Sequence, residues 1–67
     1  MRTNVGLCVR MAQVKKDVST AKMAEDFGTF RQQIQRWRSA SDMHLHKIEM
    51  LADYFGMTRD EFLGLGD

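Results

Sequence analysis

Apolar side chains recur three or four residues apart in short segments, and this spacing is what most constrains the fold. In one segment Phe30, Ile34 and Trp37 stand at positions i, i+4 and i+7, which places them on one face of a helix. Gly28 and Gly56 follow two such segments, where glycine commonly takes the left-handed conformation that ends a helix. The chain has no proline, and no segment predicts a strand. The sequence therefore predicts an all-α fold.

Five short helices are expected. The first should bury an apolar stripe made of Leu7, Met11, Val14 and Val18, widened by Cys8 and Ala12. The second should follow an N-cap at Ser19 or Thr20 and cover residues 21–27, since a hydroxyl can accept hydrogen bonds from the free backbone N–H groups of a first turn. The third should cover residues 30–38.

A loop at residues 39–42 should separate the third helix from the fourth, which Ser41 or Asp42 can cap. The fourth helix should bury the stripe Leu45, Ile48, Leu51, Ala52 and Phe55. Thr58 and Glu61 have the spacing of a capping box, which predicts a short fifth helix that holds Phe62 and Leu63. Together these elements predict a compact five-helix domain.

The length of 67 residues leaves room for one domain, residues 1–67, which buries about 60% of its unfolded surface. Cys8 is the only cysteine, so no intrachain disulfide can form, and a reducing compartment suits the chain. No apolar run approaches the roughly 18 residues that span a membrane. The start of the chain also lacks the apolar core of a signal peptide. We expect a cytoplasmic protein without a membrane partner.

The net charge of +1 is unevenly distributed along the chain. Residues 1–18 carry a net charge of +3 and residues 19–48 carry +2, whereas residues 49–67 carry −4. A molecule with one basic end and one acidic end can bind an anion through the basic end. The overall charge alone would be weak evidence for a nucleic-acid partner.

The segment GTFRQQIQRWRSAS, residues 28–41, is rich in arginine and glutamine and contains no acid. A helix that ends at Gly28, a short turn and a second helix form the pattern of a helix-turn-helix, at about residues 20–38. With Ile34 and Trp37 turned inward, the second helix presents Arg31, Gln32, Gln35 and Arg36 outward. In the major groove, arginine pairs with guanine and glutamine with adenine. The alternative to a DNA-reading helix is an ordinary solvent-exposed helix face.

The segment VSTAKMAEDFGTFRQQIQRW resembles the helix-turn-helix of the lambdoid phage repressor and Cro family, also called XRE-type. That family places Leu, Ala, Gly, Ile or Val, and Trp or Leu at the positions that Met23, Ala24, Gly28, Ile34 and Trp37 occupy here. The segment LADYFGMTRDEFL is similar to the family's fourth and fifth helices. The likeness covers roughly residues 5–64, and its positions in register are together fairly specific.

The resemblance implies two groups of DNA contacts. The base-reading positions fall on Phe30, Arg31, Gln32, Gln35 and Arg36, with Gln33 as an addition. The phosphate-contact positions fall on Thr20, Ser39, Ser41, His44 and His46, and Arg38 adds positive charge beside them. Family members usually pair an Arg near the end of the first helix with a Glu near the end of the third. Gln13 and Arg38 stand there instead, and Ala40 replaces the family's glycine after the third helix.

Several residues also have a purely structural interpretation. Trp37 shares a stripe with Ile34 and is expected in the core. The alternative for Phe30 is that it completes that core instead of touching DNA. Cys8 is expected to be a small core residue. His44 and His46 are two residues apart and cannot hold one metal from one helix face, so no metal or other cofactor is expected. No catalytic set is recognisable, and the core is too small for a deep pocket, so an enzyme is not expected.

The sequence thus predicts a regulator of transcription, Cro-like or repressor-like, that binds a double-stranded DNA operator and blocks polymerase. One reading helix covers too few base pairs for selectivity, which favours a homodimer on a palindrome. The apolar residues near the end of the chain are the expected dimer surface: Phe62, Leu63 and Leu65. The alternative is a protein-binding module, such as an antirepressor or an antitoxin-like partner, that uses the acidic C-terminal third.

Overall fold

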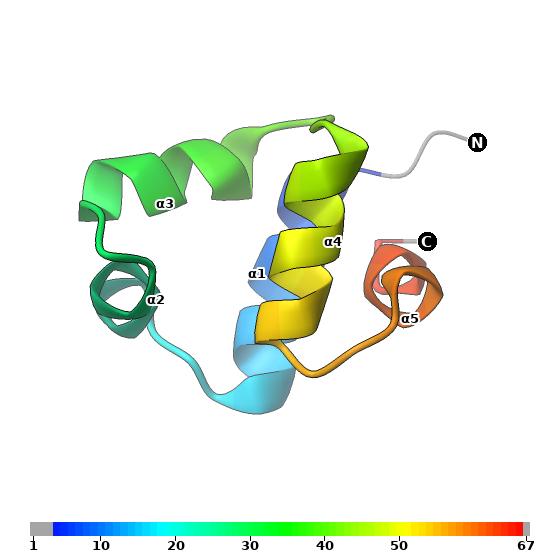
Figure 1. Cartoon of the computed structure of the whole chain (residues 1–67), viewed down its shortest axis with the longest axis horizontal. Coiled ribbons are helices and arrows are strands. Elements are labelled where there is room, and N and C mark those ends of the chain that lie inside the picture. Colours follow the sequence, from blue (N-terminus) through cyan, green and yellow to red (C-terminus); the bar gives the residue numbers. More distant parts are fainter. Residues whose placement is uncertain (1–3, 67) are drawn as a thin grey trace.

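A computed structural model describes residues 4–66, and within them it contains five α-helices and no strand. The helices are α1 (Val5–Lys16), α2 (Thr20–Phe27), α3 (Arg31–Ser39), α4 (Leu45–Tyr54) and α5 (Arg59–Gly64). They form a compact globule with a Cα radius of gyration of 10.7 Å. Figure 1 shows α2 and α3 at one end of the molecule and α5 at the other. The all-α prediction is confirmed.

Most helix ends follow the predicted chemistry. The Ser19 hydroxyl accepts a hydrogen bond from the backbone N–H of Lys22 at 3.0 Å, so Ser19 is the N-cap of α2. Gly28 ends α2 in the left-handed conformation, with φ 64°. Thr58 and Glu61 form both hydrogen bonds of the predicted capping box.

The start of α4 differs from the prediction. His44, rather than Ser41 or Asp42, is its N-cap, and the His44 side chain makes no capping hydrogen bond. The Asp42 carboxylate instead accepts a hydrogen bond from the neighbouring Met43 N–H at 2.9 Å, which stabilises the loop itself. Leu45 is correspondingly 53% exposed, because it precedes the part of α4 that turns into the core.

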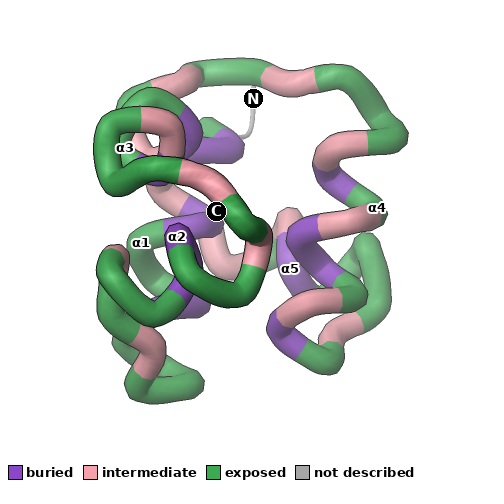
Figure 2. The backbone as a smooth tube through the Cα atoms, turned by 60° about the vertical axis from the view of Figure 1, so that its left-hand side comes forward, coloured by how far each residue is buried: buried purple, intermediate pink, exposed green. Residues whose placement is uncertain are grey.

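A row of aromatic rings connects four of the helices. Trp37 of α3 meets Phe27 of α2 edge to face, with ring centres 5.2 Å apart, and Phe27 contacts Tyr54 of α4 at 4.7 Å. The row continues from Tyr54 through Phe55 to Phe62 of α5. Around it lies the buried core, which includes Cys8, Met23, Ile34 and Leu51. Figure 2 shows these buried stretches on the inner sides of the helices.

The first helix buries only part of the stripe that the sequence predicted: Cys8 and Ala12 lie in the core, and Val18 packs against it. Met11 is 44% exposed and Val14 is 78% exposed, and Leu7 is only half-buried. The side chains that α1 does turn into the core belong to Val5, Cys8, Val9 and Ala12. They also recur at helical spacing, so α1 carries two competing apolar stripes.

Gly6 explains which face of α1 turns inward. Its N–H donates to the Ala40 carbonyl at 2.7 Å, and a Cβ on Gly6 would lie 2.5 Å from the carbonyl oxygens of Ala40 and Arg38. Only glycine permits this approach of α1 to the end of α3. The small side chains of Cys8 and Ala12 share the inward side, so α1 fits closely against its neighbours.

The end of the chain also requires a correction. Phe62, which was expected at a dimer surface, is 0% exposed and stacks on Phe55, so it offers no atom to a partner. Leu63 and Leu65 are half-buried and pack against the core. Within residues 4–66, no helix is long and apolar enough to cross a bilayer.

Candidate nucleic-acid interface

The outward side of α3 carries an uninterrupted polar surface. Ile34 and Trp37 hold the opposite side of the helix in the core, at 0% and 8% exposure. Four exposed side chains then form what we call the reading face: Arg31, Gln32, Gln35 and Arg36. They border one open hollow together with Ser39. The reading face therefore offers hydrogen-bond donors and acceptors on one rigid helix, with no carboxylate among them.

Phe30 lies beside the reading face. It is the N-cap of α3, makes no side-chain capping hydrogen bond and is 77% exposed. The alternative in which Phe30 completes the core is therefore wrong. Phe30 and the half-buried Gln33 border a second open hollow with Thr29, Gln32 and Arg36. An exposed aromatic ring here is placed to make an apolar contact with whatever the reading face binds.

Thr20 connects three helices through its hydroxyl oxygen. Arg38 Nη1 of α3 donates to it at 3.3 Å, and Gln13 Nε2 of α1 donates to it at 3.4 Å. The same Arg38 nitrogen donates to Gln35 Oε1 at 3.4 Å. Arg38 is therefore half-buried between α2 and the reading face rather than free in solvent. The ion pair that the sequence lacks is replaced by these hydrogen bonds to a hydroxyl.

A polar hollow opens at the start of α2, and we call it the α1–α2 hollow. Its cationic lining comes from Arg10, Lys22 and Arg38, and its only acid is Asp17. Gln13, Val14, Val18, Ser19 and Thr20 complete the lining. Lys22 Nζ also lies 3.0 Å from Asp26 Oδ1, so part of its charge is neutralised. The N-terminus of a helix with cations around it favours an anion such as a phosphate.

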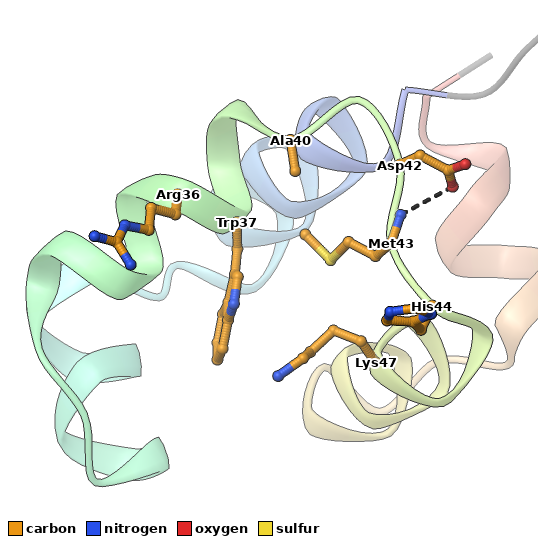
Figure 3. Close-up of a pocket in the computed structure, with 7 residues that line it drawn as sticks. All are labelled: Arg36, Trp37, Ala40, Asp42, Met43, His44 and Lys47. Atoms are coloured by element: carbon orange, nitrogen blue, oxygen red, sulfur yellow. Dashed lines mark hydrogen bonds between the residues drawn. The ribbon is translucent and has the colours of Figure 1, made fainter.

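Another hollow lies between the end of α3 and the start of α4. Trp37 and Lys47 face one another across it, with the Lys47 ammonium 4.7 Å from the centre of the Trp37 ring, whereas Arg36 points away (Figure 3). His44 borders the same hollow, and His46 is exposed in the first turn of α4. The hollow thus carries Arg36, Lys47 and one of the two histidines.

The two predicted loop serines have different surroundings. Ser39 and Ser41 are both exposed. Ser39 borders the hollow of the reading face, while the Ser41 carbonyl accepts a hydrogen bond from the Val5 N–H at 3.3 Å. Ser41 is therefore held against α1 through its backbone. Ten of the twelve predicted DNA contacts line the hollows around α3, whereas Ser41 and His46 line none of those described.

Hydrogen bonds beside α2 shift the pKa values of two side chains, Asp26 and Tyr54. The Tyr54 hydroxyl donates to Asp26 Oδ2 at 2.6 Å. This hydrogen bond, assisted by the one from Lys22, lowers the pKa of Asp26 below its ordinary value. Burial, together with the bond to Asp26, raises the pKa of Tyr54 to about 12. Asp26 therefore stays ionised and Tyr54 stays neutral at physiological pH.

Three side chains near this interface were missed by the sequence reasoning: Arg10, Lys22 and Lys47. Gln13 was noted beside Arg38, but its contact with Thr20 was not predicted. The spacing of Val5, Cys8, Val9 and Ala12 offered a second inward face for the first helix, but spacing alone did not favour it over the other. In residues 4–66, no group of three His, Cys, Asp or Glu side chains could hold a metal ion.

No protein-family model, no curated protein and no solved structure matches this chain. Its function is therefore argued from the residues and their geometry.

Proposed function

We propose that this chain is a helix-turn-helix protein of the Cro and repressor type, which binds operator DNA and regulates transcription. The observation that carries the proposal is the reading face. Four long polar side chains, all arginine or glutamine, project from a helix whose other side is locked in the core by Ile34 and Trp37. Side chains of these two types, presented on one helix without an acid among them, suit base edges in the major groove.

The connection between α2 and α3 supports the same proposal. Gly28 turns the chain in the left-handed conformation, and the Thr29 N–H returns to the Ala24 carbonyl at 2.8 Å. Ala24 and Met23 are buried beneath this turn, so α2 supports the first residues of α3. In a helix-turn-helix, these first residues enter the groove while the preceding helix crosses the phosphate backbone.

Phosphate contacts are proposed on both sides of the reading face. On one side lies the α1–α2 hollow, with Thr20 at the start of α2 and Arg38 beside it. On the other side lie Ser39, Ser41, His44 and His46. Cations and hydroxyls at these places would fix the register of α3 on the duplex without reading sequence. Arg38 has a second role here, because its hydrogen bond to Gln35 orients a reading side chain.

Regulation would follow from occupancy, since a protein bound over an operator excludes polymerase. One α3 helix reads only a few base pairs, so two copies on a palindrome are proposed, with half-sites roughly 34 Å apart. Because Phe62 is in the core, a dimer surface at this end of the molecule would rest on Leu63 and Leu65.

Selection of bound sites from a random duplex pool tests the proposal directly. We expect a symmetric consensus whose half-sites are about one helical turn apart. Binding to random duplex DNA should also weaken steadily as salt rises, because each phosphate contact releases counterions. Failure to bind any duplex at low salt would remove the proposed function.

A further inference from the structure

The outward side of α1 is apolar, although no described part of the chain covers it. Met11 is 44% exposed, Val14 is 78% exposed and Leu7 is half-buried. These three residues stand at positions i, i+4 and i+7, and we call them the outer face of α1. Isolated exposed apolar residues need no explanation, but a stripe of them along one helix commonly marks a surface that binds another helix or peptide.

Cations outnumber acids around this stripe, although Asp17 follows α1 beside Val14. Arg10 and Lys15 flank the outer face on its two sides, and α1 contains no acidic residue from Val5 to Lys16. Arg10 donates to the Gly6 carbonyl of its own helix at 3.4 Å, so its side chain lies along α1. An apolar strip with cations on both edges is complementary to an amphipathic segment whose polar residues are acidic.

The outer face of α1 runs into the α1–α2 hollow, because Arg10 and Val14 border both. Among the described residues that line this hollow, Arg10, Lys22 and Arg38 outnumber the one acid, Asp17. The positive charge beside Val14 therefore continues from α1 into the hollow.

We infer that the outer face of α1 and the adjoining hollow form a docking site for an acidic amphipathic segment of another protein. Apolar side chains of the segment would cover Met11 and Val14, and its carboxylates would lie against Arg10 and Lys15. A second copy of this chain is a poorer occupant, because pairing two α1 helices brings like charges together. Duplex DNA is poorer as well, because it offers no apolar surface to Met11 and Val14.

Occupation of this site would oppose DNA binding, a consequence that rests on the proposed function. Thr20 and Arg38 line the hollow and are also proposed phosphate contacts. A carboxylate seated beside them would take the place of a phosphate. The partner would then act as an antagonist that releases the protein from its operator.

Selection of a random peptide library on the full-length protein tests the docking site. We expect the enriched peptides to carry Asp or Glu together with Leu or Ile at helical spacing. The double variant Met11→Ser/Val14→Ser should bind these peptides at least about tenfold more weakly, which corresponds to roughly 1.4 kcal/mol. Both side chains are exposed, so the fold should persist, and circular dichroism checks this. Leu45→Ser, which removes another exposed apolar side chain, is the matched control and should bind as tightly as the parent chain.

Several outcomes would overturn the docking site. They are a library that yields no enriched peptides, enriched peptides that are basic, and equal binding by the double variant. Sedimentation equilibrium adds another: if Met11→Ser/Val14→Ser converts a dimer into a monomer, a second copy covers the face and the inference is wrong. Competition with duplex DNA is measured separately. If the peptides bind this face but the protein has no affinity for duplex DNA, the proposed DNA function is wrong and the docking site still stands.

Discussion

The guanidinium of Arg38 is hydrogen-bonded to the hydroxyl of Thr20, with 3.3 Å between Nη1 and Oγ1. This contact ties the end of α3 to the start of α2, and Gln13 brings α1 to the same oxygen at 3.4 Å. Here a neutral amide and an arginine meet at a shared hydroxyl, so Thr20 holds the orientation of α3 relative to the rest of the fold.

Replacing Thr20 with valine should therefore destabilise the protein. Valine keeps the shape of the side chain but removes the acceptor, so two partly buried donors each lose one hydrogen bond, at a cost of about 1–2 kcal/mol in all. Gln13 Nε2 keeps its bond to the Val18 carbonyl, and Arg38 Nη1 keeps its bond to Gln35. Urea unfolding followed by circular dichroism measures the change. Thr20→Ser keeps the hydroxyl and is the control, and it should lose much less stability. A loss of stability in Thr20→Ser with none in Thr20→Val would mean that the methyl group, not the hydroxyl, is what matters.

Gly6→Ala should be more disruptive than its small size suggests. The new Cβ would lie 2.5 Å from two backbone carbonyl oxygens, so α1 must move away from the end of α3. Overpacking of this kind typically costs about 1–3 kcal/mol. Gly64 offers a matched control, because a Cβ there meets nothing within 4 Å. Thermal unfolding should show a lower midpoint for Gly6→Ala alone, and a common midpoint for both variants would contradict the close approach.

Tyr54 should titrate about two pH units above an ordinary tyrosine, which loses its proton near 10.0. Its hydroxyl can donate to Asp26 only while protonated. Because folding raises this pKa to about 12, the stabilisation is complete below pH 10 and disappears as the pH rises towards 12. Tyr54 is the only tyrosine, so the absorbance of tyrosinate reports it alone. An apparent pKa near 10 in the folded protein would contradict the hydrogen bond.

The stabilisation that Asp26 contributes should have the opposite pH dependence and should be lost in acid. The bond from Tyr54 lowers the pKa of Asp26 below its ordinary value of 3.8. Its stabilisation is therefore present above that pH and is lost as the pH falls through the lowered pKa. Tyr54→Phe should raise the pKa of Asp26, which carboxyl NMR shifts can follow. The Lys22 contact remains in this variant, so part of the lowering should persist.

The sequence predicted the elements better than it predicted their orientation. Local chemistry decides a cap or a helix end, so Ser19, Gly28 and the Thr58–Glu61 pair were recognisable from the chain alone. The inward face of α1 depends on a contact with Ala40, more than thirty residues away, that only Gly6 permits. No periodicity within α1 could reveal that contact, because both of its stripes have helical spacing.

The same distinction applies to the candidate site. The outward direction of Arg31 and Gln35 follows from the inward direction of Ile34 and Trp37, so periodicity was sufficient to predict it. The position of Arg38 was not predictable in this way. Its side chain is held by Thr20, a residue of another helix, and sequence spacing does not report contacts between helices.

Gln32 and Arg36 should contribute to selectivity rather than to general affinity for DNA. Both are exposed on the reading face, one turn of α3 apart, and neither has a hydrogen bond that the fold depends on. Gln32→Ala or Arg36→Ala should therefore leave stability unchanged but weaken operator binding by about 1–3 kcal/mol. Fluorescence anisotropy on the selected operator and on a random duplex separates the two effects, and the loss on the random duplex should be much smaller. Arg59→Ala removes an exposed arginine from α5, at the end of the molecule opposite α3 (Figure 1), and should bind both duplexes like the parent chain. If Gln32→Ala and Arg36→Ala lose the same binding affinity on both duplexes, these side chains touch phosphates only, and another part of α3 must read the bases.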